Sequence, residues 1–442
     1  MKHVANRRPL FILLALAGFF LNPQYAFAQG GIDPARAQQY FQEARGLCEK
    51  DGGKLWGVSL CGPMIFADPA TRLVVANQAD KEGKLAPRES VFTGRLPEDE
   101  NMSNTATTWA GVKWTMVMWP LPEDTLVRAR LMMHELFHRV QDELGLVMQN
   151  PSNAHLDSRE GRVWLQLEWR ALRKALLESG EARRQAVTDA LFFRALRREL
   201  LPSATQEDAL EMNEGLAEYT GVKLRGTPDA ETMAYFAKRL ESAGNSPSFV
   251  RSFAYSTGPA YGLLLDASGA KWRAGLTGGS RLGDLLRTAY GVELGKDVTA
   301  AVALRAKAYD GDALRAAEVT RENERIQRIA KYRARLVDGA VLILPVLEKF
   351  DFSFDPYNLL PLDEKWTVYP TTRVSDVWGV LEVSDGALFV REGGRIVRVV
   401  VTAPADANAR PFRGDGWTLE LAPGWTLAAG ERKGDFVLRK GE

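Results

Sequence analysis

The chain has 442 residues, of which 45% are hydrophobic and 26% are charged, and it contains 39 Gly and 21 Pro. This is the composition of a folded globular protein, which excludes a disordered chain, a collagen-like repeat and a protein with many membrane spans. With 57 basic and 56 acidic side chains, the net charge is only +1. The charge therefore gives no reason to expect nucleic acid or an anionic lipid surface as a partner.

The first 28 residues have the layout of a secretory signal peptide. Three basic residues precede an apolar run over residues 10–21, and a small-x-small site follows at residues 26–28. We expect cleavage before Gln29 and an exported mature chain, periplasmic or secreted. An uncleaved anchor is the alternative, although the run is short for a bilayer span. No later stretch approaches that length, so we expect no membrane segment in the mature chain.

Cys48 and Cys61 are the only cysteines of the chain, and they flank the turn-like residues 51–53. In an exported protein this pair predicts one local disulfide. Two buried free thiols are the alternative. A thiolate metal site is disfavoured, because two cysteines supply only half of a tetrahedral ligand set.

Residues 29–108 are predicted to form an N-terminal mixed α/β segment. A short helix covers about residues 34–48, and apolar runs broken by Gly-Pro and Asp-Pro predict strands within residues 55–77. A polar, irregular stretch follows to about residue 107. The run at residues 109–119 is rich in aromatic and β-branched residues and is predicted to be a strand, which two prolines then end.

From residue 123 the spacing of apolar residues becomes helical. A helix is expected over residues 126–144, and two charged amphipathic helices within residues 160–201 form a helical insertion. Further helices are predicted over residues 208–224, 231–242, 259–266, 282–289 and 313–336. Alternating patterns with frequent Gly, Pro and Asp then predict a β-rich C-terminal domain over residues 338–442, so that a central domain would span residues 109–337.

The strongest chemical signal is the pattern H-E-x-x-H formed by His134, Glu135 and His138. Residues four apart on a helix share one face, so both imidazoles can bind one tetrahedral ion. Glu135 is then placed to take a proton from water at that ion. Two ordinary histidines on an amphipathic helix are the alternative. A catalytic zinc also needs a third protein ligand, and His155 is the one histidine left outside the motif and the signal peptide.

Residues 213–219, NEGLAEY, resemble the glutamate-ligand helix of gluzincin metallopeptidases, the thermolysin-like superfamily, and are similar to the corresponding segment of membrane-alanyl-type aminopeptidases. The resemblance implies that Glu214 is the third zinc ligand, in preference to His155. It also implies that Glu218 holds a zinc-binding histidine, which agrees with the need of a ligating imidazole for an acceptor. A solvated helix-face charge is the alternative for Glu218.

Residues 255–266, YSTGPAYGLLLD, are similar to a Y-x-x-G element found beyond the glutamate ligand in the same families. The resemblance implies that Tyr255 donates a hydrogen bond to the tetrahedral oxyanion, with Tyr261 as the fallback. A tyrosine of the apolar core is the alternative. The strand at residues 109–119 would be the sheet edge along which an extended substrate binds.

The resemblance covers about residues 109–266, with two departures. The separation between His138 and Glu214 is longer than in thermolysin or the aminopeptidases, because the helical insertion fills it. No counterpart exists of the G-x-M-E-N motif with which aminopeptidases hold a free amine, so exopeptidase activity is not implied.

The resemblance implies an α+β, thermolysin-like fold and an exported zinc-dependent metallopeptidase, a hydrolase with one Zn²⁺ per chain that acts on a peptide or protein substrate. Two alternatives remain open. One is a zinc-binding envelope protein with a silent site that acts through its β domain, and the other is an amidase acting on a non-peptide or cell-wall amide. An open coordination position and Glu135 favour catalysis, because a closed structural site needs neither. Substrate preference and oligomeric state are left undetermined.

Overall fold

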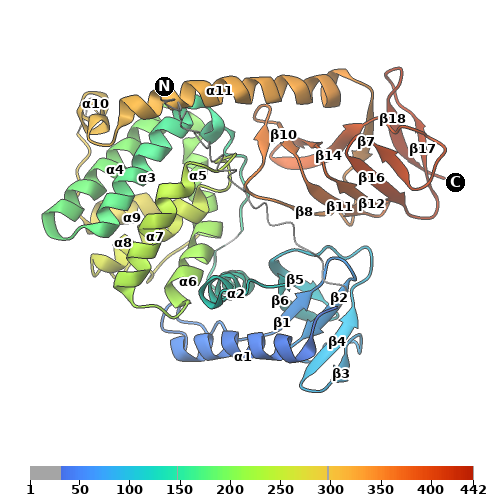
Figure 1. Ribbon diagram of the computed structural model, residues 1–442, viewed down its shortest axis with the longest axis horizontal. Helices are drawn as coiled ribbons and strands as arrows, with labels where there is room; N and C mark the ends of the chain where they lie inside the picture. Colours follow the sequence, from blue (N-terminus) through green and yellow to red (C-terminus); the bar gives the residue numbers. More distant parts are fainter. Residues whose placement is uncertain (1–30, 147, 296–297, 442) are drawn as a thin grey trace, which may run out of the picture.

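The computed structural model describes residues 31–146, 148–295 and 298–441, so the predicted signal peptide lies outside the described residues. Three groups of elements follow one another along the chain: a small sheet with flanking helices, a bundle of helices, and a β-rich end (Figure 1). A long helix, α11 (Gly311–Arg333), leads from the bundle to the β-rich end. The mixture of helices and sheets confirms the α+β class. Among the described residues, no helix is long and apolar enough to cross a membrane.

The N-terminal region is built around a six-stranded sheet. Its elements are α1 (Pro34–Asp51), β1 (Met64–Ala67), β2 (Leu73–Ala76), β3 (Ala86–Arg88), β4 (Val91–Arg95), β5 (Thr105–Trp109) and β6 (Val112–Met118). The strand order is β3-β4-β2-β1-β6-β5, and β1 and β6 are parallel. Strands β3 and β4 occupy the stretch that the sequence predicts to be irregular.

The prediction of a single strand over residues 109–119 is wrong. Ala110 and Gly111 both have positive φ and turn the chain, so that β5 and β6 form a hairpin. Two consecutive left-handed residues match the twist of hairpin strands. Alanine is uncommon in that conformation, so the sequence pattern did not indicate a turn here. As a result β6 lies inside the sheet and β5 forms its free edge.

Helices α1 and α2 (Thr125–Val140) pack on one face of the N-terminal sheet. Phe41, Phe66 and Leu136 are buried where the three meet. Asp124 begins α2, because its side chain accepts a hydrogen bond from the Val127 amide at 2.8 Å and satisfies a free donor of the first turn.

The two cysteines lie beside this packing. Cys48, near the end of α1, forms a disulfide with Cys61, and their Cα atoms are 5.4 Å apart. The predicted local disulfide is confirmed, and it ties α1 to the loop that leads into β1.

The helical bundle follows α2. Its elements are η1 (Ala154–Asp157), α3 (Arg159–Leu177), α4 (Gly180–Leu200), η2 (Pro202–Gln206), α5 (Glu207–Leu210), η3 (Glu211–Gly215), α6 (Leu216–Leu224), α7 (Asp229–Ala243), α8 (Ala254–Ala267), α9 (Leu282–Ala289), α10 (Val298–Lys307) and α11. The continuous helix predicted over residues 208–224 is wrong in one respect, because η3 is a π-helix between α5 and α6. Helix α10 was not predicted.

The C-terminal region is a sandwich of two sheets. After η4 (Ala334–Asp338), its strands are β7 (Val341–Pro345), β8 (Asp351–Phe354), β9 (Leu360–Pro361), β10 (Trp366–Tyr369), β11 (Thr372–Asp376), β12 (Gly379–Val383), β13 (Ala387–Glu392), β14 (Arg395–Thr402), β15 (Phe412–Gly414), β16 (Trp417–Leu421), β17 (Trp425–Ala429) and β18 (Phe436–Lys440). The sheet orders are β17-β18-β7-β14-β13-β10-β9 and β15-β16-β12-β11-β8. Side chains of both sheets, such as Leu381 and Phe389, fill the core between them. Strand β8 is a free edge of the smaller sheet.

Candidate metal centre

Helix α2 brings the three residues of the H-E-x-x-H pattern together at the end of a cleft. His134 and His138 project from one face of the helix, and both are buried. Their Nε2 atoms are only 3.2 Å apart. The spacing of four residues, which is slightly more than one helical turn, thus produces the pair of imidazoles that the sequence predicts.

Glu214 reaches this pair from the π-helix η3. Its Oε2 atom lies 3.6 Å from Nε2 of His134 and 3.5 Å from Nε2 of His138. One ligand atom from each of these three residues lies within 4.8 Å of the others, so the three residues could hold a metal ion. We call His134, His138 and Glu214 the ligand group. A π-helical turn carries an extra residue and is frequent at functional sites.

The hydrogen bonds of the outer nitrogens (Nδ1) of the two imidazoles determine whether the inner nitrogens (Nε2) carry a proton or a lone pair. Nδ1 of His134 lies 3.1 Å from Oε2 of Glu218, and Nδ1 of His138 lies 2.9 Å from Oε1 of Gln141. Both partners are acceptors, so each Nδ1 carries the proton and donates it. In neutral imidazoles the Nε2 lone pairs of His134 and His138 then point toward the same spot, which is the arrangement that a bound cation stabilises.

The surrounding charges also favour a cation. Burial opposes the charged form of His134, but the carboxylates of Glu135, Glu214 and Glu218 outweigh burial and raise the pKa of this imidazole to about 10. Burial likewise opposes ionisation of Glu214, yet the two imidazoles and Arg251 hold the pKa of Glu214 well below its usual range. A positive charge at this spot is thus stabilised, whether a proton or a metal supplies it.

Glu135 lies beside the ligand group without belonging to it. Its Oε1 atom is 3.9 Å from Nε2 of His134. Its Oε2 atom is buried and has no hydrogen-bond partner among the described residues, which is unusual for a buried carboxylate oxygen. Burial raises the pKa of this carboxyl, while the imidazoles of His134 and His138 oppose the increase. Such a carboxylate can accept a proton from a molecule bound in the cleft.

Tyr255 approaches the ligand group from helix α8. Its hydroxyl donates to Oε2 of Glu214 at 2.8 Å, and its ring stacks on that of His134 with 5.7 Å between the ring centroids. Burial, reinforced by Glu214, raises the pKa of the Tyr255 hydroxyl, so it keeps its proton and remains a donor. Tyr261, the alternative tyrosine, instead donates to Glu168 at 2.8 Å and faces away from the ligand group.

Two glycines allow this close approach of η3 and α8. A Cβ atom added to Gly258 would lie 2.3 Å from the Cα atom of Gly215, a distance that real Cβ atoms do not show. Only residues without a side chain permit the two backbones to cross here. Because Gly215 follows Glu214 and Gly258 is three residues beyond Tyr255, the crossing brings the two functional groups into contact.

Glu218 forms the support of His134. Besides the His134 imidazole, it accepts hydrogen bonds from Arg130 and Arg239, and its side chain is only 1% exposed. Although burial opposes ionisation, these partners lower the pKa of Glu218 and keep it charged. Glu218 is thus no solvated charge on a helix face.

Sequence reasoning missed the roles of three side chains at the site, namely Gln141, Asn213 and Arg251. Gln141 supports His138 and donates through its amide to Asn213 at 3.2 Å. Arg251 donates to Oε1 of Glu214 at 2.9 Å. Helical spacing could have indicated Gln141, which lies three residues after His138, whereas Arg251 lies in the turn before α8 and no sequence pattern indicates it.

The ligand group opens into a cleft of about 800 Å³, near the upper end of the usual size for ligand sites. Residues of β5, including Thr105 and Thr107, line one part of it. Residues of β8 and the loop that follows, including Phe354 and Tyr357, line another part. The N-terminal sheet and the C-terminal sandwich are neighbours (Figure 1), and both contribute residues to this cleft. A free sheet edge therefore borders the cleft from each of them.

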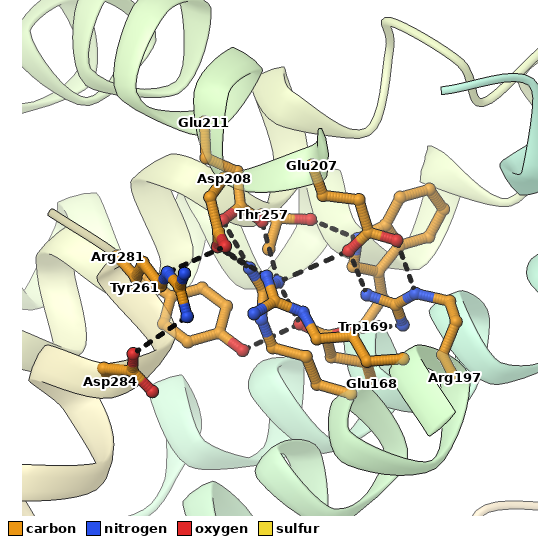
Figure 2. A network of polar contacts seen from close by, with 12 residues as sticks. Glu168, Trp169, Arg197, Glu207, Asp208, Glu211, Thr257, Tyr261, Arg281 and Asp284 are labelled. Atoms are coloured by element: carbon orange, nitrogen blue, oxygen red, sulfur yellow. Dashed lines mark hydrogen bonds and ion pairs between the residues drawn. The ribbon is translucent and has the colours of Figure 1, made fainter. Parts of the chain in front are cut away.

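A second buried group of charges, which we name the ion network, lies in the helical bundle (Figure 2). Arg194 pairs with Glu211 at 2.6 Å, and Arg197 pairs with Glu207 at 2.7 Å. The network comprises Glu168, Arg194, Arg197, Glu207, Asp208, Glu211 and Tyr261. His155, at 2.9 Å from Glu207, contacts this network and not the ligand group.

Comparisons of the chain with protein-family models, with curated proteins and with solved structures found no match. The function of the site is therefore inferred from its geometry.

Proposed function

We propose that this protein is a zinc-dependent metallopeptidase of the gluzincin type, with a thermolysin-like arrangement around its active site. One observation carries the proposal: the inner nitrogens of His134 and His138 and a carboxylate oxygen of Glu214 converge, while Glu135 lies beside them without being a ligand. A closed structural site needs no such additional carboxylate and no cleft.

The donor set suits zinc. Two neutral imidazoles and one carboxylate are the protein ligands of many catalytic zinc sites, and they leave one coordination position open. Zinc held by His134, His138 and Glu214 would polarise the carbonyl of the scissile bond and increase the acidity of water beside it. Gln141 and Glu218 orient the two imidazoles by accepting their outer protons.

The remaining side chains have distinct roles in hydrolysis. Glu135 takes the proton of the attacking water and delivers it to the departing amine, since it is the carboxylate of the cleft without a hydrogen-bond partner for its Oε2 atom among the described residues. The Tyr255 hydroxyl, which donates to Glu214 in the structure, would turn from Glu214 and donate its one hydrogen bond to the oxyanion that develops on the carbonyl. The free edge of β5 offers backbone groups to an extended peptide, which would add to the sheet as a further strand.

The test combines metal content with cleavage of a peptide library by the purified chain of residues 29–442. We expect one zinc per chain and cleavage that Glu135→Gln reduces by about 10²–10⁴-fold, with zinc content unchanged. Glutamine keeps the shape of the side chain but cannot take the proton. Glu143→Gln is the matched control, because Glu143 is exposed just beyond the same helix, and it should leave cleavage unchanged.

Two results would contradict the proposal. Cleavage at the wild-type rate by the Glu135→Gln variant would exclude this carboxylate as the base. Stoichiometric zinc without cleavage of any peptide would favour a silent zinc site in an envelope protein or an amidase with a different substrate.

A further inference from the structure

Arg391 on β13 is an arginine of the cleft that has no carboxylate partner among the described residues. The two other arginines that line the cleft are paired, Arg130 with Glu218 and Arg251 with Glu214. The Arg391 side chain makes one hydrogen bond within the described part of the chain, a long one of 3.4 Å to a backbone carbonyl. Its Nε atom is buried without a partner. A guanidinium carries five N–H donors in a planar fork, so most of this capacity is free for a ligand.

Aromatic side chains line the same cleft as Arg391 and the ligand group. The Phe354 ring lies 5.3 Å from Cζ of Arg251, which in turn holds Glu214. Tyr369 lies 5.2 Å from Phe354, measured between ring centroids, and it pairs with Ala387 of β13, four residues before Arg391 on the same strand. Phe354, Tyr369 and Arg391 all line the same cleft as the ligand group. The cleft thus has an aromatic wall and, further along strand β13, a guanidinium without a carboxylate partner among the described residues.

The wall belongs to the C-terminal sandwich, which is held against the rim of the N-terminal sheet. Arg373 donates to the backbone carbonyl of Glu98 at 2.9 Å, and Lys349 lies 3.5 Å from Asp99. On the bundle side, the Ser248 amide donates to the backbone carbonyl of Tyr357 at 3.2 Å. These contacts fix the wall relative to the ligand group, as a binding subsite requires.

We propose that the C-terminal sandwich selects the substrate. Arg391 binds a carboxylate of an extended peptide, and Phe354 and Tyr369 pack against an apolar side chain that lies between this carboxylate and the scissile bond. The carboxylate is either an acidic side chain or the free C-terminus of the peptide, because a guanidinium forms the same two-pronged contact with both. The position of the scissile bond in this inference rests on the proposed function.

Binding tests the inference without any need for cleavage. The probes are fluorescein-labelled peptides with an amidated end, in which one glutamate is moved along a neutral sequence, and the neutral peptide with a free or amidated C-terminus. They are titrated into the zinc-loaded Glu135→Gln chain of residues 29–442. We expect Arg391→Gln to weaken the best carboxylate peptide about 10–100-fold and to change the neutral amidated peptide less than about twofold.

Two further variants sharpen the comparison. Arg391→Glu should reverse the preference, so that a peptide with lysine at the same position binds better than the one with glutamate. Arg395→Gln is the matched control, because Arg395 is exposed on the neighbouring strand β14, and its variant should bind all probes as the parent does. A dependence on one position of the glutamate identifies a side-chain carboxylate, and a dependence on the free end identifies the terminus.

The inference is overturned if Arg391→Gln binds the carboxylate peptides as the parent does, or if it weakens all probes equally and lowers the melting temperature, as a structural role would. The outcomes also separate the two proposals. Cleavage by the wild-type chain with no preference for a carboxylate overturns this inference alone. Binding that depends on Arg391, with no cleavage of any peptide, supports the inference and overturns the proposed function.

Discussion

The candidate metal centre and the ion network are both buried groups of charge, and both use the short segment from α5 to α6. In the ion network, carboxylates meet guanidinium groups at ion-pair distance, as Glu207 does with Arg197. At the metal centre, Glu214 also pairs with Arg251 through Oε1, but its Oε2 atom faces two imidazoles across 3.5–3.6 Å, and the group borders a cleft. A buried carboxylate alone therefore does not indicate a site. Metal-ligand atoms that converge beside a cleft do indicate one.

The π-helix η3 carries residues of both groups. Glu211, at its first position, is held by both terminal nitrogens of Arg194, at 2.8 and 2.6 Å, while Glu214 points toward the histidines. Figure 2 shows how residues of α3, α4, α5 and α8 contribute to the network. The network thus anchors the segment that presents Glu214, and we expect it to act on stability and the metal centre to act on chemistry.

Of the substitutions that test this comparison, Arg197→Ala in the ion network is expected to have the largest effect. The substitution leaves Glu168 and Glu207 as buried carboxylates without their main partner, so the free energy of unfolding should fall by about 3–5 kcal/mol. Urea unfolding measures the loss. Arg184→Ala, at an exposed position of the same helix, should change stability by no more than about 0.5 kcal/mol. Equal losses in both variants would show that the network contributes no more than a surface charge.

A smaller effect is expected from Gln141→Ala, which acts on the metal centre instead. The change removes the acceptor of the outer N–H of His138, so zinc affinity should fall about 10–100-fold. Competition with a chelator of known affinity measures it. Gln141→Glu, which keeps an acceptor at this position, should retain most of the affinity. An alanine variant that binds zinc as tightly as the wild type would contradict the supporting role of Gln141.

The smallest effect concerns pH and the ion network. Burial raises the pKa of Glu211 to about 7, since Asp208 and Glu207 reinforce the increase and Arg194 only partly opposes it. Between pH 4.5 and 7 the folded chain keeps a proton that the unfolded chain has released, so this group makes stability fall as the pH rises, by at most about 1.4 kcal/mol per pH unit. Glu211→Gln should remove this part of the slope.

Urea unfolding of both chains at pH 5, 6, 7 and 8 isolates the contribution of Glu211, because other titrating groups are common to the two. The difference in unfolding free energy between the wild type and the variant should change across this window and level off above pH 7. Parallel curves for the two chains would show that Glu211 is ionised in the folded protein throughout.

The sequence by itself determined the local features of this protein. The spacing of His134 and His138 within one amphipathic helix places both imidazoles on the same face wherever that helix packs. Most helices of the bundle, though not α10 or the π-helix η3, also follow from patterns within short stretches of chain, as do the disulfide between Cys48 and Cys61 and the β-rich end. Local spacing suffices to predict these features, because hydrophobic period and turn residues are properties of short stretches of chain.

Only the tertiary structure decided what surrounds the histidines. The support of His134 by Glu218 spans 84 residues of chain, and the approach of Tyr255 to Glu214 depends on a crossing of two helices at paired glycines. The edge position of β5 required the turn at Ala110 and Gly111, which residue propensities disfavour. Arg391 reaches the cleft only because a separate sandwich packs beside it. Such contacts join distant segments, and packing of the whole chain, not any local pattern, selects them.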